Sequence, residues 1–203
     1  LFKDLYLEKA EKEQASQEGR EAWQAYPVLY LDFNTENYND ENSMHTILHT
    51  HLSQWEKQYE ADTSEQTFSS RFKGIIQRAY HQTGKQVVIL VDEYDKPLLQ
   101  TMGINEALNE QYRNTLKAFY SVIKTCDEYI RFAFLTGVTK FSKISIFSDL
   151  NNLRDISMEK QYAGLCGITQ TELETNFQPD IQVLADEQNL TYQEALAALK
   201  QWY

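Results

Sequence analysis

The feature that most constrains the fold is a run of five consecutive apolar residues at positions 87–91, four of them β-branched. Gly84 ends the segment before it and Pro97 opens the segment after it, so the run has the length and boundaries of a short strand rather than those of a helix. Because its residues show no polar alternation, we expect a strand buried on both faces, as in parallel sheets covered by helices. The run therefore predicts an α/β fold.

Two acidic residues, Asp92 and Glu93, come directly after this strand. Ligands of parallel sheets bind beyond the carboxyl ends of the strands, which is where these side chains would emerge. An apolar strand that ends in Asp-Glu has the form of a Walker B element, in which Asp92 would hold Mg²⁺ with its water shell and Glu93 would orient or deprotonate the attacking water. The alternative is structural, because the carboxyl edge of any parallel strand faces water and accepts acidic residues.

Length, net charge and cysteine content limit the number of domains, the classes of partner and the cellular compartment that this chain fits. With 203 residues and 42% hydrophobic content, one domain is the default and two small domains are the alternative. The net charge of -11 argues against a nucleic acid or an anionic membrane as the main partner of this segment, and no apolar run is long enough to cross a bilayer. Cys126 and Cys166 are too few for a disulfide framework, which fits a reducing compartment and a cytoplasmic location.

The chain alternates between strand and helix patterns. Two further strands are predicted at 28–33 and 130–136, and helices are expected to start near Ser43, Ser64 and Asn105. The order of strand, two helices, strand, helix, strand indicates a doubly wound parallel sheet with right-handed crossovers.

The last part of the chain has a different character. Two capping boxes, Thr169-x-x-Glu172 and Thr191-x-x-Glu194, open helical patterns there. We therefore expect a small helical appendage.

Three ordered motifs resemble one known family. They read VDEYDKP at 91–97, RFAFLTGVTKFSK at 131–143 and IFSDLNNL at 146–153. Through them the chain resembles the AAA-ATPase-like family common in gut and oral anaerobic bacteria, and the resemblance continues through LCGIT at 165–169 to Trp202-Tyr203. It implies a P-loop NTPase fold with ATP and Mg²⁺ as cofactors. In the parent protein an attached domain resembling PD-(D/E)XK nucleases usually follows, and the 203 residues contain none.

The chain departs from the family pattern at the phosphate-binding loop. A Walker A motif, G-x-x-x-x-G-K-[ST], lies between a strand and a helix so that its backbone N–H groups wrap the phosphates. The nearest candidate, Gly84-Lys85, fails because residue 79 is Ala, residue 86 is Gln and a strand follows. Family members carry Walker A upstream of the part that matches Leu1. We thus expect a partial P-loop core without the Walker A strand over 1–165 and the helical appendage over 166–203.

The resemblance also suggests further site residues. It places the 86–92 strand between the other two, so Thr136 would lie beside Asp92 and act as a sensor of the γ-phosphate or the attacking water. The alternative for Thr136 is a side chain that hydrogen-bonds the backbone of its own turn before Gly137. Lys140, Lys143 and Arg154 are candidates for neutralising phosphate charge, with Lys140 as the choice for nucleotide binding, or they are solvated surface charges. The expected catalytic residues are Glu93 and Thr136, and the expected metal ligand is Asp92.

Two functional hypotheses remain. In one, the chain carries the Walker B half of a Mg²⁺-dependent ATPase that switches attached domains. In the other, it is a non-catalytic nucleotide-fold scaffold that binds a partner protein. In both cases the missing strand would leave an apolar edge on the 130–136 strand, and we expect self-association or a covering segment there.

Overall fold

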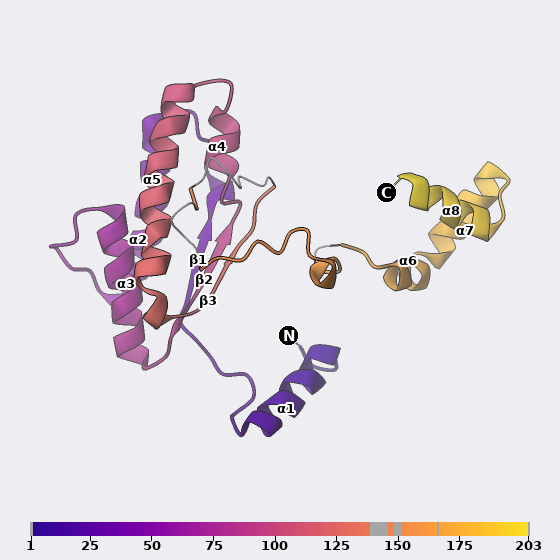
Figure 1. The fold of residues 1–203 in the computed structure, drawn as a ribbon, viewed down its shortest axis with the longest axis horizontal. Coiled ribbons are helices and arrows are strands. Elements are labelled where there is room, and N and C mark those ends of the chain that lie inside the picture. The colour runs from indigo at the N-terminus through magenta and orange to yellow at the C-terminus, as the bar shows by residue number, and fades with distance from the viewer. Residues whose placement is uncertain (1, 139–145, 148–151, 166, 203) are drawn as a thin grey trace. The chain divides into compact units, whose positions relative to one another are not determined.

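The computed structural model describes residues 2–138, 146–147, 152–165 and 167–202 (Figure 1). It divides into two compact units, Leu1–Asn152 and Leu153–Tyr203. The boundary expected from the sequence between the partial P-loop core and the helical appendage, at 165/166, stays a prediction.

The first unit is built on three parallel strands, β1 (Val28–Asp32), β2 (Val87–Asp92) and β3 (Ile130–Leu135), in the order β1-β2-β3. The predicted strands, their parallel direction and the central place of β2 are confirmed. Helices α2 (Glu41–Tyr59) and α3 (Phe68–Thr83) connect β1 to β2, and α4 (Lys96–Thr101) and α5 (Glu106–Thr125) connect β2 to β3. The fold is therefore α/β with a P-loop-like parallel sheet.

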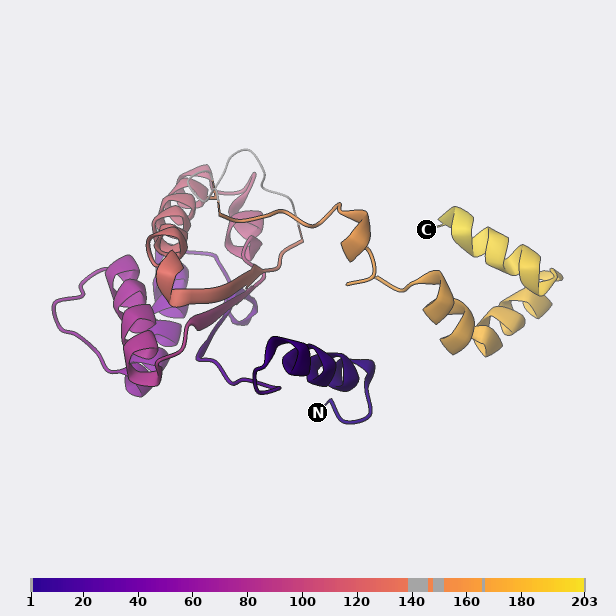
Figure 2. The ribbon, with the colours of Figure 1, turned by 60° about the horizontal axis from the view of Figure 1, so that its bottom comes forward.

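The helices α2, α3 and α5 lie on the same side of this sheet (Figures 1 and 2). On that side β2 buries Val87, Ile89 and Val91, and the rings of Phe72 in α3 and Phe119 in α5 stack with their centroids 4.4 Å apart. Residues at alternate positions of β2 are only half-buried. The expectation that the strand is buried on both faces is thus wrong for the described residues, because the packed helices among them cover one face.

Helix boundaries follow from capping groups. The Asp40 carboxylate accepts hydrogen bonds from the N–H groups of Asn42 and Ser43, so α2 begins earlier than the expected Ser43 cap. Likewise Thr67, rather than Ser64, caps α3 in a reciprocal box with Ser70. Two expectations are confirmed: Gly84 ends α3 in the left-handed conformation, and Asn105 caps α5.

The remaining elements of the first unit are short or peripheral. Helix α1 (Tyr6–Glu18) precedes the sheet, and two 3₁₀ turns, Phe33–Thr35 and Asp127–Tyr129, flank strands. No helix in the described part of the chain is both long and apolar enough to cross a lipid bilayer.

The second unit holds a 3₁₀ turn (Lys160–Tyr162) and three helices, α6 (Gln170–Asn176), α7 (Gln178–Gln188) and α8 (Tyr192–Trp202). Both expected capping boxes are present, since Thr169 and Thr191 each exchange hydrogen bonds with the Glu three residues later. A small core of Ile181, Ala185 and Ala195 joins α7 to α8.

Candidate functional site

Polar side chains gather at the carboxyl edge of the sheet. In the register of the strands, Asp32 at the end of β1 lies opposite Asp92 at the end of β2. The ladder between β2 and β3 continues beyond β3, because the Thr136 N–H donates to the Val91 carbonyl at 2.8 Å. Three neighbouring strands therefore present Asp32, Asp92 and Thr136 side by side, at the edge where parallel sheets bind ligands.

The Asp92 carboxylate is held by two hydroxyl groups. Thr136 Oγ1 donates to its Oδ1 at 2.5 Å, and the Tyr30 hydroxyl approaches its Oδ2 at 3.4 Å. The structure thus brings Asp92 and Thr136 together, as the resemblance suggested. The Thr136 hydroxyl bonds to the Asp92 carboxylate and also lies close to the backbone carbonyl of Val91. Its action as a sensor stays a prediction.

Glu93 occupies a sharp turn directly after the strand. Its φ of 54° lies in the left-handed region, which costs a residue with a side chain about 1–3 kcal/mol. The turn is closed by the Lys96 N–H, which donates to the Glu93 carbonyl at 3.1 Å. Such strain is typical of positions where the direction of a side chain matters more than local stability.

Lys96 ties two loops of this edge together. Its ammonium donates to the carbonyl of Asn34 at 2.6 Å and to the Asn34 side-chain oxygen at 3.2 Å. The Asn34 N–H in turn donates to Asp32 Oδ1 at 2.7 Å. Lys96 therefore braces the loop after β1 against the loop after β2.

The basic candidates are placed differently. Lys140 and Lys143 lie outside the described residues, so the assignment of Lys140 to nucleotide binding stays a prediction. Arg154 belongs to the second unit, where its guanidinium pairs with both carboxylate oxygens of Glu159 at 2.7 and 2.5 Å.

Sequence reasoning missed Tyr30 and Asp32 as members of this site. Partial burial raises the pKa of the Tyr30 phenol, and the negative charges of Asp32 and Asp92 raise it further. An ordinary phenol is already protonated at neutral pH, so the raised pKa only extends to higher pH the range in which Tyr30 is a hydrogen-bond donor. Asp32 carried a usable signal, because it ends its strand as Asp92 does and carboxyl ends of parallel strands meet at one edge.

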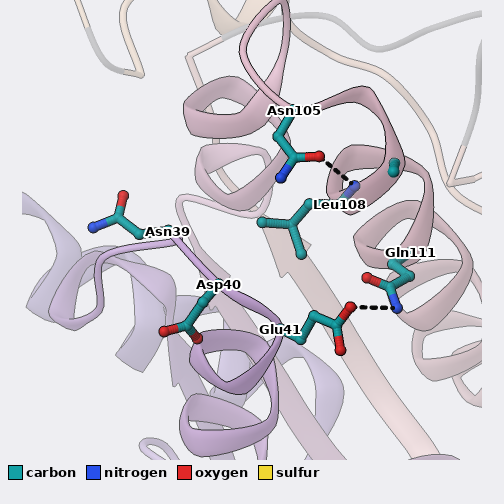
Figure 3. Close-up of a pocket in the computed structure, with 7 residues that line it drawn as sticks. Asn39, Asp40, Glu41, Asn105, Leu108 and Gln111 are labelled. Atoms are coloured by element: carbon teal, nitrogen blue, oxygen red, sulfur yellow. Dashed lines mark hydrogen bonds between the residues drawn. The ribbon is translucent and has the colours of Figure 1, made fainter.

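A cavity of about 300 Å³ lies elsewhere, at the N-termini of α2 and α5 (Figure 3). A helix N-terminus attracts anions, but here the Asp40 carboxylate already caps α2. The neighbouring Glu41 accepts a hydrogen bond from Gln111 at 3.3 Å. None of the strand-end residues lines this cavity. Among its polar side chains, Asp40 and Asn105 cap helices, and Glu41 pairs with Gln111.

The strand-end arrangement suits a hard divalent cation. Asp32 and Asp92 offer carboxylate oxygens, the ligands that Mg²⁺ prefers, and Mg²⁺ in nucleotide sites uses one or two carboxylates with water and phosphate. In the part of the chain that the structure describes, no three His, Cys, Asp or Glu side chains converge as a metal cage. The two strand-end carboxylates would thus supply only part of the coordination shell of such a cation.

Comparison with known proteins agrees with the fold. The model of a family described as "Predicted AAA-ATPase" matches residues 1–147. An "Uncharacterized protein in vnfD 5'region" of Azotobacter chroococcum mcd 1 is 39% identical over 156 residues, which cover 77% of this chain and 30% of that protein. No solved structure gives a significant match. The family match spans most of the chain and includes all three strands, so the chain belongs to the AAA-ATPase-like family.

Proposed function

We propose that this chain carries the Walker B half of a Mg²⁺-dependent ATP-hydrolysing site, in a longer protein that uses hydrolysis to switch the position of attached domains. The observation that carries the proposal is the Asp92 carboxylate at the end of the central strand, held by Thr136 from the neighbouring strand. In this role Asp92 holds the cation and its water shell, and Glu93 orients or deprotonates the attacking water. When bound, Mg²⁺ would neutralise charge on the phosphates.

The phosphate-binding half of the site must come from another segment under this proposal. The 203 residues contain no G-x-x-x-x-G-K-[ST] motif, and the ladder of β3 is open on its outer side in the described sheet. The chain spans 30% of the length of the Azotobacter relative, so proteins of this kind have room for further segments. We assign the Walker A strand and a nuclease-like neighbouring domain to such a longer protein, and Lys140 of this chain remains the proposed additional phosphate ligand.

A second candidate function is a non-catalytic scaffold that binds a partner protein. It is favoured by the exposed apolar side chains on the open face of the sheet, among them Val28, Tyr30 and Phe132. A scaffold has no use for a strained Glu93 beside a braced Asp92, which is why the ATPase is preferred.

Nucleotide titration with and without Mg²⁺ tests the proposal. The protein to use joins this chain to an upstream segment that bears a Walker A motif. Asp92→Ala should weaken binding of Mg²⁺-ATP by about tenfold or more and leave Mg²⁺-free ATP binding unchanged, because it removes a carboxylate from the surroundings of the metal. Asp127→Ala is the matched control, because it removes a carboxylate at the amino ends of the strands, just before β3 and away from the strand-end site. Equal binding by the Asp92 variant and the parent would contradict the proposal, and no binding by either would favour the scaffold.

A further inference from the structure

Asp95 stands out among the described residues as a charged side chain in the interior. It is 0% exposed, although it lies only three positions after Asp92 at the edge of the sheet. Burial of a carboxylate costs several kcal/mol unless hydrogen bonds compensate it. The hydrogen bonds of a buried carboxylate therefore show which part of the chain it holds.

The Asp95 carboxylate does not cap the following helix. Asp95 is the N-cap residue of α4, where an Asp side chain normally accepts a hydrogen bond from the first turn. Here its side chain makes no capping bond, and only its backbone carbonyl accepts from the N–H groups of Leu98 and Leu99. The carboxylate is directed instead to the loop after β3, where its Oδ1 accepts from the Val138 N–H at 3.3 Å.

The loop lies directly on this carboxylate because residue 137 is glycine. A Cβ atom at Gly137 would meet Asp95 Oδ1 at 2.7 Å and the Tyr94 ring at 2.7 Å, which are closer than any side chain tolerates. Tyr94 holds the same loop through its backbone, since its N–H donates to the Thr136 carbonyl at 2.9 Å. The loop is thus fixed on both sides of Gly137.

We propose that Asp95 is a positioning residue: through Gly137 and Val138 it fixes the loop after β3 so that the Thr136 hydroxyl stays on the Asp92 carboxylate. This inference rests on the proposed function for its effect on ATP hydrolysis. The structural part of the inference, that Asp95 holds Thr136 in place, rests on the contacts alone. Asp95 touches neither nucleotide nor metal in this scheme and acts only by holding another residue.

The first test measures hydrogen exchange of single amides in the 203-residue chain. Asp95→Leu keeps the size of the side chain and removes the acceptor, so exchange of the Val138 and Tyr94 amides should rise by about tenfold or more. Asp95→Asn retains an oxygen at the same position and should restore most of the protection. The Val88 amide, which donates to Pro27 at the other end of the sheet, is the internal reference.

Asn109→Leu is the matched control variant. Asn109 is 1% exposed, and its side-chain amide donates to the Leu98 carbonyl and the Thr101 hydroxyl, both in α4. Among the described residues, its hydrogen bonds do not extend to residues 136–138 after β3. If Asp95→Leu raises exchange at Val138 and Tyr94 no more than Asn109→Leu does, the inference is wrong. Should Asp95→Leu fail to fold, Gly137→Ala disturbs the same contact from the loop side and should loosen the same two amides.

The second test measures kinetics in the protein joined to a Walker A segment. Asp95→Leu should lower kcat by about tenfold or more while KM for ATP changes by less than about twofold, because misplacement of the site affects the chemical step more than binding. The Asn109→Leu variant should keep the parent kcat. A parent protein without ATPase activity would sink the proposed function, while the exchange test would still decide whether Asp95 holds Thr136. An active parent whose Asp95→Leu variant keeps the kcat of the control overturns the inference.

Discussion

At the scale of residues, the strand-end site depends on hydroxyl groups as much as on carboxylates. The Asp92 carboxylate accepts hydrogen bonds from the hydroxyls of Thr136 and Tyr30, which fix its orientation without neutralising its charge. A carboxylate held in this way remains available to a cation. Glu93, in contrast, is directed by its own left-handed backbone. The two acidic neighbours are therefore positioned by different means.

Replacement of Glu93 by Gln tests its role as the base. The amide keeps the shape of the side chain but cannot accept the proton, so single-turnover hydrolysis should fall by about 100-fold or more while ATP binding is retained. The measurement uses the protein joined to a Walker A segment. Glu36→Gln, in the turn after β1, is the control for a lost charge near the site. A Glu93→Gln variant that turns over ATP at the parent rate would remove Glu93 from the mechanism.

At the scale of elements, α2 and α3 are joined by a bidentate ion pair. Arg71 Nε and Nη2 donate to the two Glu56 oxygens at 2.7 and 2.8 Å, and both side chains are largely buried. The hydrogen bonds from Arg71 lower the pKa of Glu56 below its ordinary value. A depressed carboxyl pKa stabilises the fold above the unfolded-state pKa, and this contribution is lost as the pH falls through the folded-state pKa.

Glu56→Gln should therefore destabilise the first unit by about 1–2 kcal/mol at pH 7. The difference between the variant and the parent should shrink as the pH falls below the ordinary Glu pKa of about 4.3, because the parent then loses the same charge. Urea unfolding at a series of pH values measures this. Glu13→Gln on the exposed side of α1 should show no such difference. A destabilisation that is constant with pH would mean that packing, and not the ion pair, joins the helices.

The edge strand β3 gives the second prediction at this scale. In the described sheet its outer side has no partner strand. Phe132, whose side chain lies on the open face of the sheet, is 54% exposed on this strand. The chain should self-associate at high concentration, and Phe132→Lys should restore the monomer because a charged edge resists pairing. Ile104→Lys, an exposed apolar position away from the sheet, is the control. Light scattering that shows a monomer for the parent chain would contradict this prediction.

Sequence patterns identified the elements better than their ends or their surroundings. Short runs rich in apolar and aromatic residues located all three strands, because strand propensity and apolar patterning act locally. The N-cap residues are Asp40 and Thr67, whereas the helices were expected to start near Ser43 and Ser64. Several nearby residues were able to cap, and the geometry of the preceding turn selected among them. Tyr30 escaped attention because its contact with Asp92 depends on strand register, which the sequence of one strand does not contain.

At the scale of the whole molecule, the open face of the sheet is the feature that composition did not predict. It carries a row of exposed or half-buried side chains from all three strands, namely Val28, Tyr30, Val88, Leu90, Phe132 and Phe134. The apolar run of β2 suggested a cover on both faces, and the described helices supply one. Under the proposed function, the same longer protein that provides the phosphate-binding loop would also provide the second cover.

The 203-residue chain alone carries only part of the proposed site. It should hydrolyse ATP no faster than background and bind Mg²⁺-ATP weakly, because its sequence lacks the Walker A lysine and the backbone N–H groups that hold the β- and γ-phosphates. Joining the chain to a Walker A segment should bring back slow hydrolysis, measured in single turnover beside nucleotide titration. A joined protein with its Walker A lysine replaced by Ala is the control. Tight Mg²⁺-ATP binding by the 203 residues alone would show that the phosphates bind to other residues of this chain, and the assignment of the site to the strand ends would then fail.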